Sequence, residues 1–247
     1  MKLHYIGIVR NEGTPAHEIC AEKELSAYSR FTRTKSVHPV PPARAHACGL
    51  HCFREANADV LSYAEFMTMF AKTVAERTKP GQRQDVEEQG NWEFLRRKPP
   101  RDKRTRADWF FADYTFHAYG RTEGICGIII SDHQYPALVA HQLLSKCVDE
   151  FLAKHPRSSW ANGKPEIVMP ELKEYLTKYQ DPQQADSIMK IQKELDETKI
   201  VLHKTIESVL QRGEKIDDLV AKSDGLSSQS KMFYQQAKKQ NSCCVVM

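Results

Sequence analysis

The feature that most constrains this 247-residue chain is a long, regular seam in its last quarter. Sixteen positions follow one another from 188 to 240 at alternating spacings of three and four residues, and ten of them are apolar. An alternation held for this length is typical of a coiled coil, whose helix must bury its apolar stripe against partner helices. The apolar seam positions are Ile188, Ile191, Leu195, Leu202, Val209, Ile216, Leu219, Leu226, Phe233 and Ala237. We therefore expect residues 185–242 to form a long helix that pairs with other helices.

A charged residue, Arg212, occupies a seam position near the middle of this helix, where an aliphatic side chain is expected. An unpaired guanidinium costs several kcal/mol to bury, so Arg212 either meets acceptors from partner helices or lies on the helix surface. A polar residue at one seam position can fix the register and the number of helices. Gly213 and Gly225 each cost a helix about 1 kcal/mol relative to alanine. We expect the helix to be weak alone and to form when it binds.

The last residues carry a lipid-attachment pattern. Cys244-Val245-Val246-Met247 matches the C-a-a-X prenylation pattern, and methionine at its last position favours a farnesyl group. Cys243 is a natural second acylation site beside it. One lipid chain binds a membrane marginally and reversibly, whereas two chains anchor a protein stably. Because no apolar run approaches the roughly 20 residues of a membrane span, we expect membrane attachment through these lipids, and no cofactor besides them.

Charge and cysteine usage narrow the class of protein. The chain has 36 basic and 32 acidic residues, and the whole excess of +4 lies between residues 91 and 112. The Arg96–Arg106 cluster could contact phosphates or an anionic membrane. It lacks interleaved aromatic residues, so we expect a disordered basic loop and no nucleic-acid partner. The seven cysteines are odd in number, and no secretory signal peptide precedes them, which indicates a reducing cytosol.

The first 180 residues have the element order of an α+β domain. This order predicts an antiparallel sheet with flanking helices, and the connection lengths point to one more strand, either near 82–89 or elsewhere. The strand over 125–130 is continuously apolar, so we expect it to be buried on both faces. The predicted strands are 3–9, part of 16–31, 114–119 and 125–130, and the predicted helices are 65–78, 137–152 and 171–179.

Two stretches fit this domain badly. Residues 35–64 bear prolines and have no clear period, and residues 91–113 are basic and bear tryptophans. Long structureless loops inside a compact domain are uncommon, so we interpret both as insertions, and translation of retained introns is our hypothesis for one or both. The predicted organisation is a domain over 1–180, a linker over 181–184, a coiled-coil motif over 185–242 and a lipidated tail over 243–247.

No catalytic or metal site is predicted. Five potential zinc ligands gather in one stretch, but no second ligand pair lies at a standard distance from Cys48 and Cys52. The five are His38, His46, Cys48, His51 and Cys52. The chain has no glycine-rich phosphate loop, nucleophile elbow or supported Ser/His/Asp pattern. Cys126 and Cys147 lie on apolar elements and are interpreted as small core residues. The sequence therefore gives little support to an enzyme.

Taken together, these features resemble the longin-domain R-SNAREs, and within them the prenylated synaptobrevin homologues in their fungal form. The run over 185–215 carries the SNARE motif of that family, and Arg212 falls at its central ionic layer. The resemblance also covers residues 1–34, 65–89 and 114–180. The two insertions are departures from the family pattern.

The resemblance implies a profilin-like longin domain followed by a long α-helical SNARE motif. Arg212 would meet three glutamines, one from each of three partner helices, in a parallel four-helix bundle whose zippering drives membrane fusion. Cys244 would be farnesylated, and Cys243 would receive the second lipid, palmitoyl, which shifts the protein from the cytosol to membranes. In the cytosolic form the longin domain folds back on the SNARE motif and shelters the farnesyl group. The family serves endoplasmic reticulum–Golgi, endosomal, vacuolar and autophagosomal traffic.

Two other functions stay open. One is a lipid-anchored peripheral adaptor whose coiled coil pairs with a second copy. The other is a thiol acyltransferase, because a self-palmitoylating activity has been attributed to the longin domain of the family, although the sequence shows no site for it.

Overall fold

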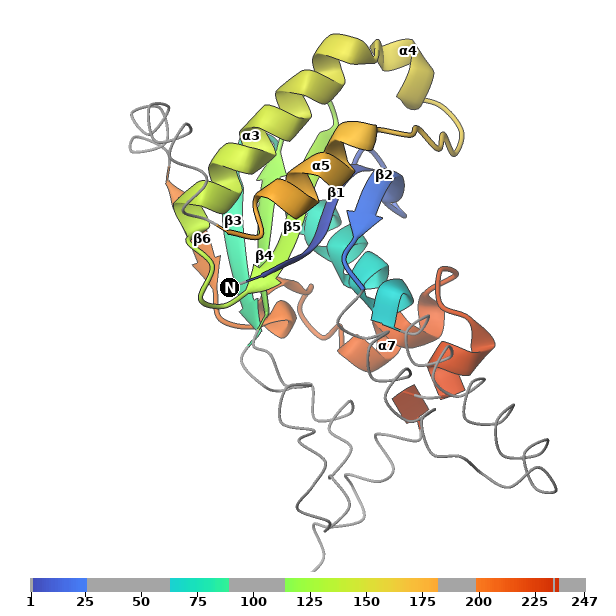
Figure 1. Cartoon of the computed structure of the whole chain (residues 1–247). Coiled ribbons are helices and arrows are strands. Elements are labelled where there is room, and N and C mark those ends of the chain that lie inside the picture. The colour runs from blue at the N-terminus through green and yellow to red at the C-terminus, as the bar shows by residue number, and fades with distance from the viewer. Residues whose placement is uncertain (1, 26–62, 89–113, 182–198, 233, 236–247) are drawn as a thin grey trace, which may run out of the picture.

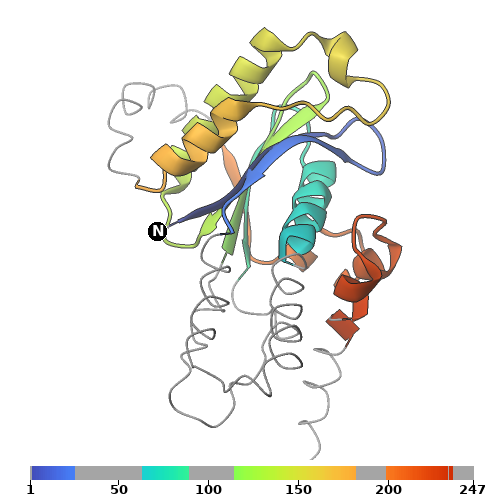
Figure 2. The ribbon, with the colours of Figure 1, turned by 45° about the vertical axis from the view of Figure 1, so that its right-hand side comes forward.

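A six-stranded mixed sheet lies at the centre of the structure, with helices on both of its faces (Figure 1 and Figure 2). The computed structural model describes residues 2–25, 63–88, 114–181, 199–232 and 234–235. The strands follow the order β2-β1-β5-β4-β3-β6, and neighbours are antiparallel except that β6 runs parallel to β3. Their bounds are β1 Leu3–Arg10, β2 His17–Lys23, β3 Arg83–Glu88, β4 Tyr114–Gly120, β5 Ile125–Asp132 and β6 Ile200–His203.

Helices pack on both faces of this sheet. The helices α3 (Ala137–Lys154) and α5 (Pro170–Lys178) cover one face, and the helix over 63–77 covers the other (Figure 2). The short helix α4 (Arg157–Trp160), which was not predicted, lies between α3 and α5. Each helix buries an apolar stripe, so the molecule has two hydrophobic cores, one on each side of the sheet.

The strand β5 shows why the sheet needs cover on both faces. Ile125 and Ile129 belong to the core under α3, whereas Ile128 and Ile130 belong to the core under the helix over 63–77. Successive side chains of a strand point to opposite faces, so a continuously apolar strand must be covered twice. The prediction that this strand is buried on both faces is confirmed.

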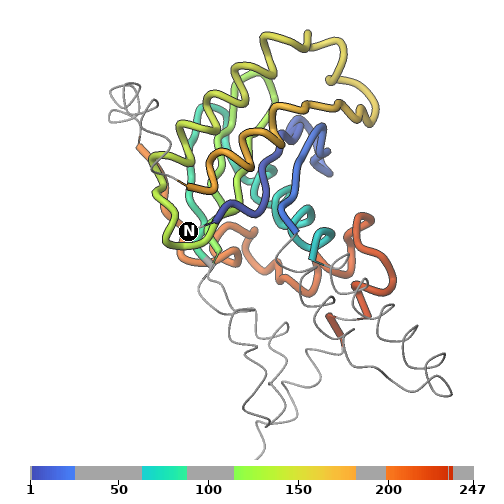
Figure 3. Tube along the Cα trace, in the orientation of Figure 1, coloured from blue at the N-terminus to red at the C-terminus, as the bar shows by residue number. Residues whose placement is uncertain are grey.

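After β6 the chain crosses from the edge of the sheet to the face that carries the helix over 63–77 (Figure 3). It forms a 3-10 helix, η5, a short helix, α7, and a further helical stretch. These elements are η5 Ile206–Val209, α7 Ile216–Lys222 and the helical residues 228–232 and 234–235. Among the described residues, no helix is long and apolar enough to cross a bilayer.

The sequence predicted the strands and helices of the first domain well. All four predicted strands are present, the extra strand near 82–89 is β3, and the three predicted helices are present. Residues 63–64, assigned to the first insertion, begin a helix instead. The rest of that insertion, the whole of 91–113 and the linker beyond Asp181 lie outside the described residues.

The predicted continuous helix over 188–240 is not what the described residues 199–232 form. They contain one strand, a 3-10 helix and short α-helices separated by turns. Gly213 has a φ of +89°, a left-handed conformation that interrupts an α-helix and that glycine adopts at little cost. The Thr205 hydroxyl accepts the Ser208 N–H at 3.2 Å and so begins η5 as a separate element. Within the described residues 199–232, the seam positions therefore do not share one helix.

Candidate functional site: the docked C-terminal segment

Residues 199–232 and 234–235, which carry part of the seam, are docked on the N-terminal domain, and we call them the docked segment. Its first element, β6, extends the sheet by parallel pairing with β3, in which Asp85 lies opposite Leu202 and Val86 lies opposite His203. A strand at the edge of a sheet has unpaired backbone groups that can pair with a further strand. The edge of β3 thus holds the start of the docked segment through its backbone.

Apolar side chains anchor the rest of the docked segment. Ile206, Val220, Leu226 and Tyr234 are buried in the same core as the helix over 63–77. The ring of Tyr234 lies 6.3 Å from that of Phe66, measured between ring centroids. Full burial of a valine, leucine or isoleucine side chain stabilises by about 1.5–3 kcal/mol relative to leaving it exposed. A few spaced anchors therefore hold a segment that is otherwise mostly at the surface.

Polar contacts join the same two parts of the molecule. The Arg77 Nη2 atom donates to Glu214 Oε2 at 3.0 Å, and the Ser227 N–H donates to Glu65 Oε2 at 2.9 Å. Burial alone would raise the pKa of Glu214, but hydrogen bonds from the Gln211 N–H and the Arg77 guanidinium lower it overall. The pKa of Glu65 is also lowered, because hydrogen bonds from serines of the docked segment outweigh its burial. Both carboxylates are therefore better stabilised as anions while the segment is docked.

Arg212 and the seam positions are scattered in this conformation. Arg212 is exposed in a turn, and Leu202 is 58% exposed on β6. Leu226 is buried against the domain, whereas Val209, Ile216 and Leu219 are half-buried. The remaining predicted functional residues lie outside the described residues; they are Ile188, Ile191, Leu195, Phe233, Ala237, Cys243 and Cys244. The structure therefore does not bring the seam together into one stripe.

Sequence reasoning missed three of the four apolar anchors. Ile206, Val220 and Tyr234 each follow a seam position by one residue, so they lie beside the stripe that a coiled coil would bury. Their apolar character was visible in the sequence, but the seam template assigned them to the flank of a helix. Docking and coiled-coil formation thus use overlapping but different sets of side chains.

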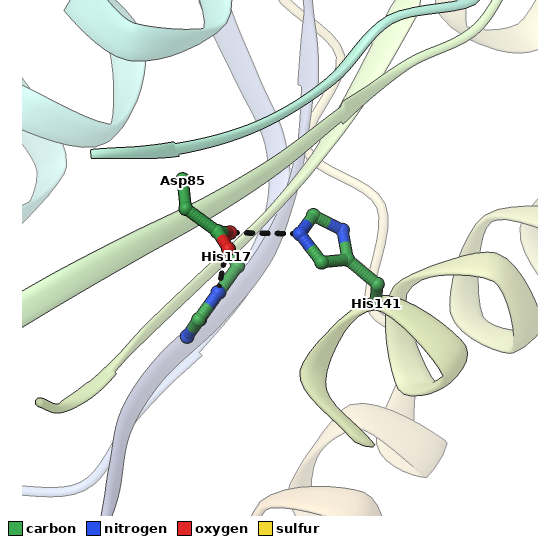
Figure 4. A group of neighbouring side chains, drawn as sticks. All are labelled: Asp85, His117 and His141. Atoms are coloured by element: carbon green, nitrogen blue, oxygen red, sulfur yellow. Dashed lines mark hydrogen bonds and ion pairs between the residues drawn. The ribbon is translucent and has the colours of Figure 1, made fainter. Parts of the chain in front are cut away.

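A second group that the sequence did not predict lies on the opposite face of the sheet. The carboxylate of Asp85 on β3 meets the imidazoles of His117 on β4 and His141 on α3 (Figure 4). Its Oδ1 atom lies 2.7 Å from His117 Nδ1 and 2.7 Å from His141 Nε2. Ser131 Oγ on β5 lies 3.0 Å from His117 Nε2. These polar residues occupy alternate positions of strands in a covered sheet, which is the signal that could have revealed them.

Electrostatics fixes the charge state of this group. Burial would raise the pKa of Asp85, but hydrogen bonds from His117 and His141 hold it well below its usual range. Burial lowers the pKa of His141, although its bond to Asp85 opposes the shift. Asp85 is therefore an anion at neutral pH, and His141 is neutral. His141 Nδ1 is buried without a hydrogen-bond partner.

This group has the connectivity of a Ser-His-Asp triad but not the access that catalysis requires. Ser131 is 0% exposed, and its hydroxyl donates to the Asp132 carbonyl at 3.2 Å. A nucleophile must reach its substrate in a suitable pose. Ser131 is covered on the α3 face, so the triad geometry does not make it a nucleophile.

The cysteines of the described residues are poor nucleophiles as well. Cys20, Cys126 and Cys147 are free and buried, and burial raises the pKa of Cys20 and of Cys126 to about 12. Because the thiolate is the reactive form, these groups are inert near neutral pH. The interpretation of Cys126 and Cys147 as core residues is confirmed.

Comparison with known proteins accounts for both halves of the chain. The family model of the regulated-SNARE-like longin domain matches residues 93–176, and that of synaptobrevin matches residues 187–245. The chain is 47% identical over 246 residues to the synaptobrevin homologue Ykt6 of Schizosaccharomyces pombe. It is 45% identical over 250 residues to those of Eremothecium gossypii and Saccharomyces cerevisiae, and all three alignments span both chains completely. The chain therefore belongs to the Ykt6 family of synaptobrevin homologues, longin-domain R-SNAREs of vesicle fusion.

Proposed function

We propose that this R-SNARE alternates between a closed form, in which the docked segment lies on the longin domain, and an open form. In the open form residues 185–242 become one helix of a four-helix bundle that brings two membranes together. The pairing of β6 with β3 carries this proposal. Residues 200–203 cannot belong to a strand and to a continuous helix at the same time, so docking excludes bundle formation.

The buried anchors set the strength of this autoinhibition. Ile206, Val220 and Tyr234 must leave the core of the longin domain before the segment can straighten into a helix. Their exposure costs free energy, which the burial of seam residues such as Leu202 and Val209 in the bundle offsets. The closed form thus prevents premature pairing, while partner helices supply the driving force for opening.

Arg212 supplies the central charged layer of the bundle in this proposal. Its guanidinium is exposed in the closed form, so no buried charge must be released when the segment leaves. Five N–H donors allow one guanidinium to bond three glutamine side chains, one from each of three partner helices. An arginine at this position fixes the register of the bundle, since a shifted helix would bury the charge against apolar residues.

Lipids at the tail complete the proposal. Cys244 takes a farnesyl group and Cys243 a palmitoyl group, which together anchor the chain on the cytoplasmic face of a membrane. The singly lipidated closed form then resides in the cytosol. The membranes are those of Golgi, endosomal, vacuolar, autophagosomal and endoplasmic reticulum traffic, which the family resemblance suggests.

The experiment mixes the full chain with three glutamine-bearing SNARE helices and measures the rate and stability of the complex. We expect an SDS-resistant complex of four helices that is weakened by Arg212→Leu. We also expect Val220→Ala to speed assembly, because Val220 is a buried anchor of the docked segment and is not a seam residue. Met232→Ala serves as the control for docking, because Met232 is 59% exposed in the closed form. It should leave the rate of assembly unchanged.

The alternative functions give different outcomes. A stable homodimer that is indifferent to Arg212→Leu would support a coiled-coil adaptor and contradict the proposal. Loss of membrane pelleting in Cys244→Ser, expressed in cells, tests the lipid anchor separately. Acyl transfer to another protein by a chain lacking residues 185–247 would instead identify an acyltransferase.

A further inference from the structure

We propose that Asp85, His117 and His141 form a binding site for one zinc ion. The three side chains come from β3, β4 and α3 and meet at one point between sheet and helix (Figure 4). Two imidazoles and one carboxylate are a ligand set that zinc takes in proteins. The site is independent of the SNARE chemistry, because it lies on the opposite face of the sheet from the apolar anchors of the docked segment.

The distances suit a small cation after slight adjustment. Both histidine nitrogens lie 2.7 Å from the same Asp85 oxygen, and the three potential ligand atoms all lie within 4.8 Å of one another. Zinc bonds to nitrogen and to carboxylate oxygen are about 2.0–2.2 Å long. An ion among the three atoms therefore needs only small movements of the side chains. The second oxygen of Asp85 or a water molecule would supply the fourth ligand.

The hydrogen bonds around His117 are compatible with a cation. The Ser131 hydroxyl lies 3.0 Å from His117 Nε2 and 3.2 Å from the Asp132 carbonyl, so it can donate to either one. When His117 Nδ1 donates to Asp85, the hydroxyl donates to Nε2; when a cation takes the place of the Nδ1 proton, Nε2–H donates to the hydroxyl, which donates to the Asp132 carbonyl.

A zinc ion would replace the Nδ1 proton between His117 and the carboxylate. The N–H of Nε2 would then donate to Ser131, which is the outer contact that ligating histidines usually make.

His141 contributes a ring nitrogen that already faces the other two ligands. Its side chain is 0% exposed, and its Nε2 atom lies 2.7 Å from Asp85 Oδ1. Coordination of a cation would use Nε2, whereas Nδ1 has no hydrogen-bond partner among the described residues.

The position of the site predicts what the ion would stabilise. Asp85 lies on β3 directly opposite Leu202 of β6, and His141 ties the same strand to α3. A zinc ion would thus link the strand that receives the docked segment to its neighbour β4 and to the covering helix. We infer a structural ion that stiffens this edge of the sheet.

The test uses the full chain, stripped with a chelator, and titrates it with Zn²⁺ by calorimetry. We expect one ion per chain and a higher thermal unfolding temperature in its presence. Both His141→Ala and Asp85→Asn should weaken the affinity at least about tenfold, and Ser131→Ala should weaken it by about 10- to 100-fold through the lost outer contact. The matched control is His155→Gln, a histidine that follows the last residue of α3 and lies outside the site.

Cysteines elsewhere in the chain can also bind zinc, so the titration needs a second measurement that identifies the ligands. Titration with Co²⁺ distinguishes the ligands, because thiolates give an intense near-ultraviolet charge-transfer band and a His-His-Asp site does not. Far-ultraviolet circular dichroism identifies any variant that has lost its fold. If His141→Ala or Asp85→Asn has lost it, the zinc affinity of Ser131→Ala, the mildest change, is the deciding measurement. No binding, binding with a thiolate band, or affinity unchanged in Ser131→Ala and Asp85→Asn would each overturn the proposal.

Discussion

The longin domain and the docked segment belong to one sheet, but very different amounts of buried surface hold them. Strand β1 buries seven of its eight residues, whereas β6 has four residues, none of them classed as buried. The docked segment depends on spaced anchors such as Ile206 and Tyr234. Fixing the backbone costs about 1–2 kcal/mol per residue in conformational entropy. The domain can meet that cost from its own cores, whereas the docked segment has few buried residues with which to offset it.

This difference assigns separate roles to the two regions. In the proposed function, the domain is a permanent scaffold and the docked segment is the part that changes its structure. Low-stability regions of this kind are the ones that move in regulated proteins. The comparison predicts that substitutions in the domain act on global unfolding, while substitutions under the segment act on docking alone.

The largest effect is expected for Phe151→Ala in the core of the longin domain. The Phe151 side chain is 0% exposed and its ring lies 6.3 Å from that of Trp160. Truncation of a buried phenylalanine costs about 3–5 kcal/mol. Urea unfolding should show the whole transition shifted, with the signals of domain and segment lost together. A loss of the segment signal alone would contradict the difference between the two regions.

A smaller effect, on docking only, is expected for Leu226→Ala. Leu226 is 5% exposed, and we expect a cost near the lower end of the leucine-to-alanine range, about 2 kcal/mol, because the segment can adjust. Hydrogen exchange of the amides in β6 should accelerate about 30-fold, while those in β5 keep their protection. Met232→Ala, at an exposed position of the same segment, is the control. Unchanged exchange in β6 would show that Leu226 does not anchor the segment.

A still smaller effect on docking, seen as faster hydrogen exchange in the docked segment, is expected for Arg77→Glu. This change places two carboxylates side by side. The Arg77–Glu214 pair is partly exposed, with side-chain exposures of 18% and 19%, so the ion pair is worth about 1 kcal/mol or less. The double variant with Glu214→Arg should restore the exchange rates of the docked segment, which a double-mutant cycle measures. If hydrogen exchange in the docked segment stays fast in the double variant, Arg77 acts through packing and not through its charge.

The smallest effect is expected from pH. The pKa values of Glu65 and Glu214 lie below their ordinary value of 4.5 while the segment is docked. Groups with a lowered pKa stabilise the docked form above their ordinary pKa, and this contribution is lost as the pH falls through the lowered value. Exchange in β6 should therefore accelerate below about pH 4.5, after correction for the intrinsic rate. In the variant with Glu65→Gln and Glu214→Gln the acceleration should be smaller; an equal acceleration would assign it to other carboxylates.

The sequence predicted the longin domain well because local pattern and final environment agree there. The apolar run at 125–130 is buried on two faces, and the helical face with Phe66, Phe70 and Val74 lies in the core. Strand β3 was the weak point, since Arg83 and Asp85 are polar residues in inward positions. Val86 is the only apolar residue of the six, so no apolar alternation marks this strand in the sequence.

The docked segment and the buried histidines could not be found this way. The Asp85, His117 and His141 side chains are far apart in sequence, and only the packing of α3 on the β3–β4 pair brings them together. Likewise, nothing local indicates that residues 200–203 form a strand. The edge of β3 provides the backbone partners that make these residues a strand.

The sequence by itself determined the longin domain and the apolar seam that predicts a helix. Periodicity, turn residues and the charge at Arg212 specify a longin domain and a helix that needs partners, because those signals act over a few residues or one helical face. Only the tertiary structure decided that residues 200–203 form a strand and that Ile206 and Tyr234 are buried. The physical reason is that these contacts join residues more than a hundred positions apart, and the free energy of a marginal segment depends on the surface it finds.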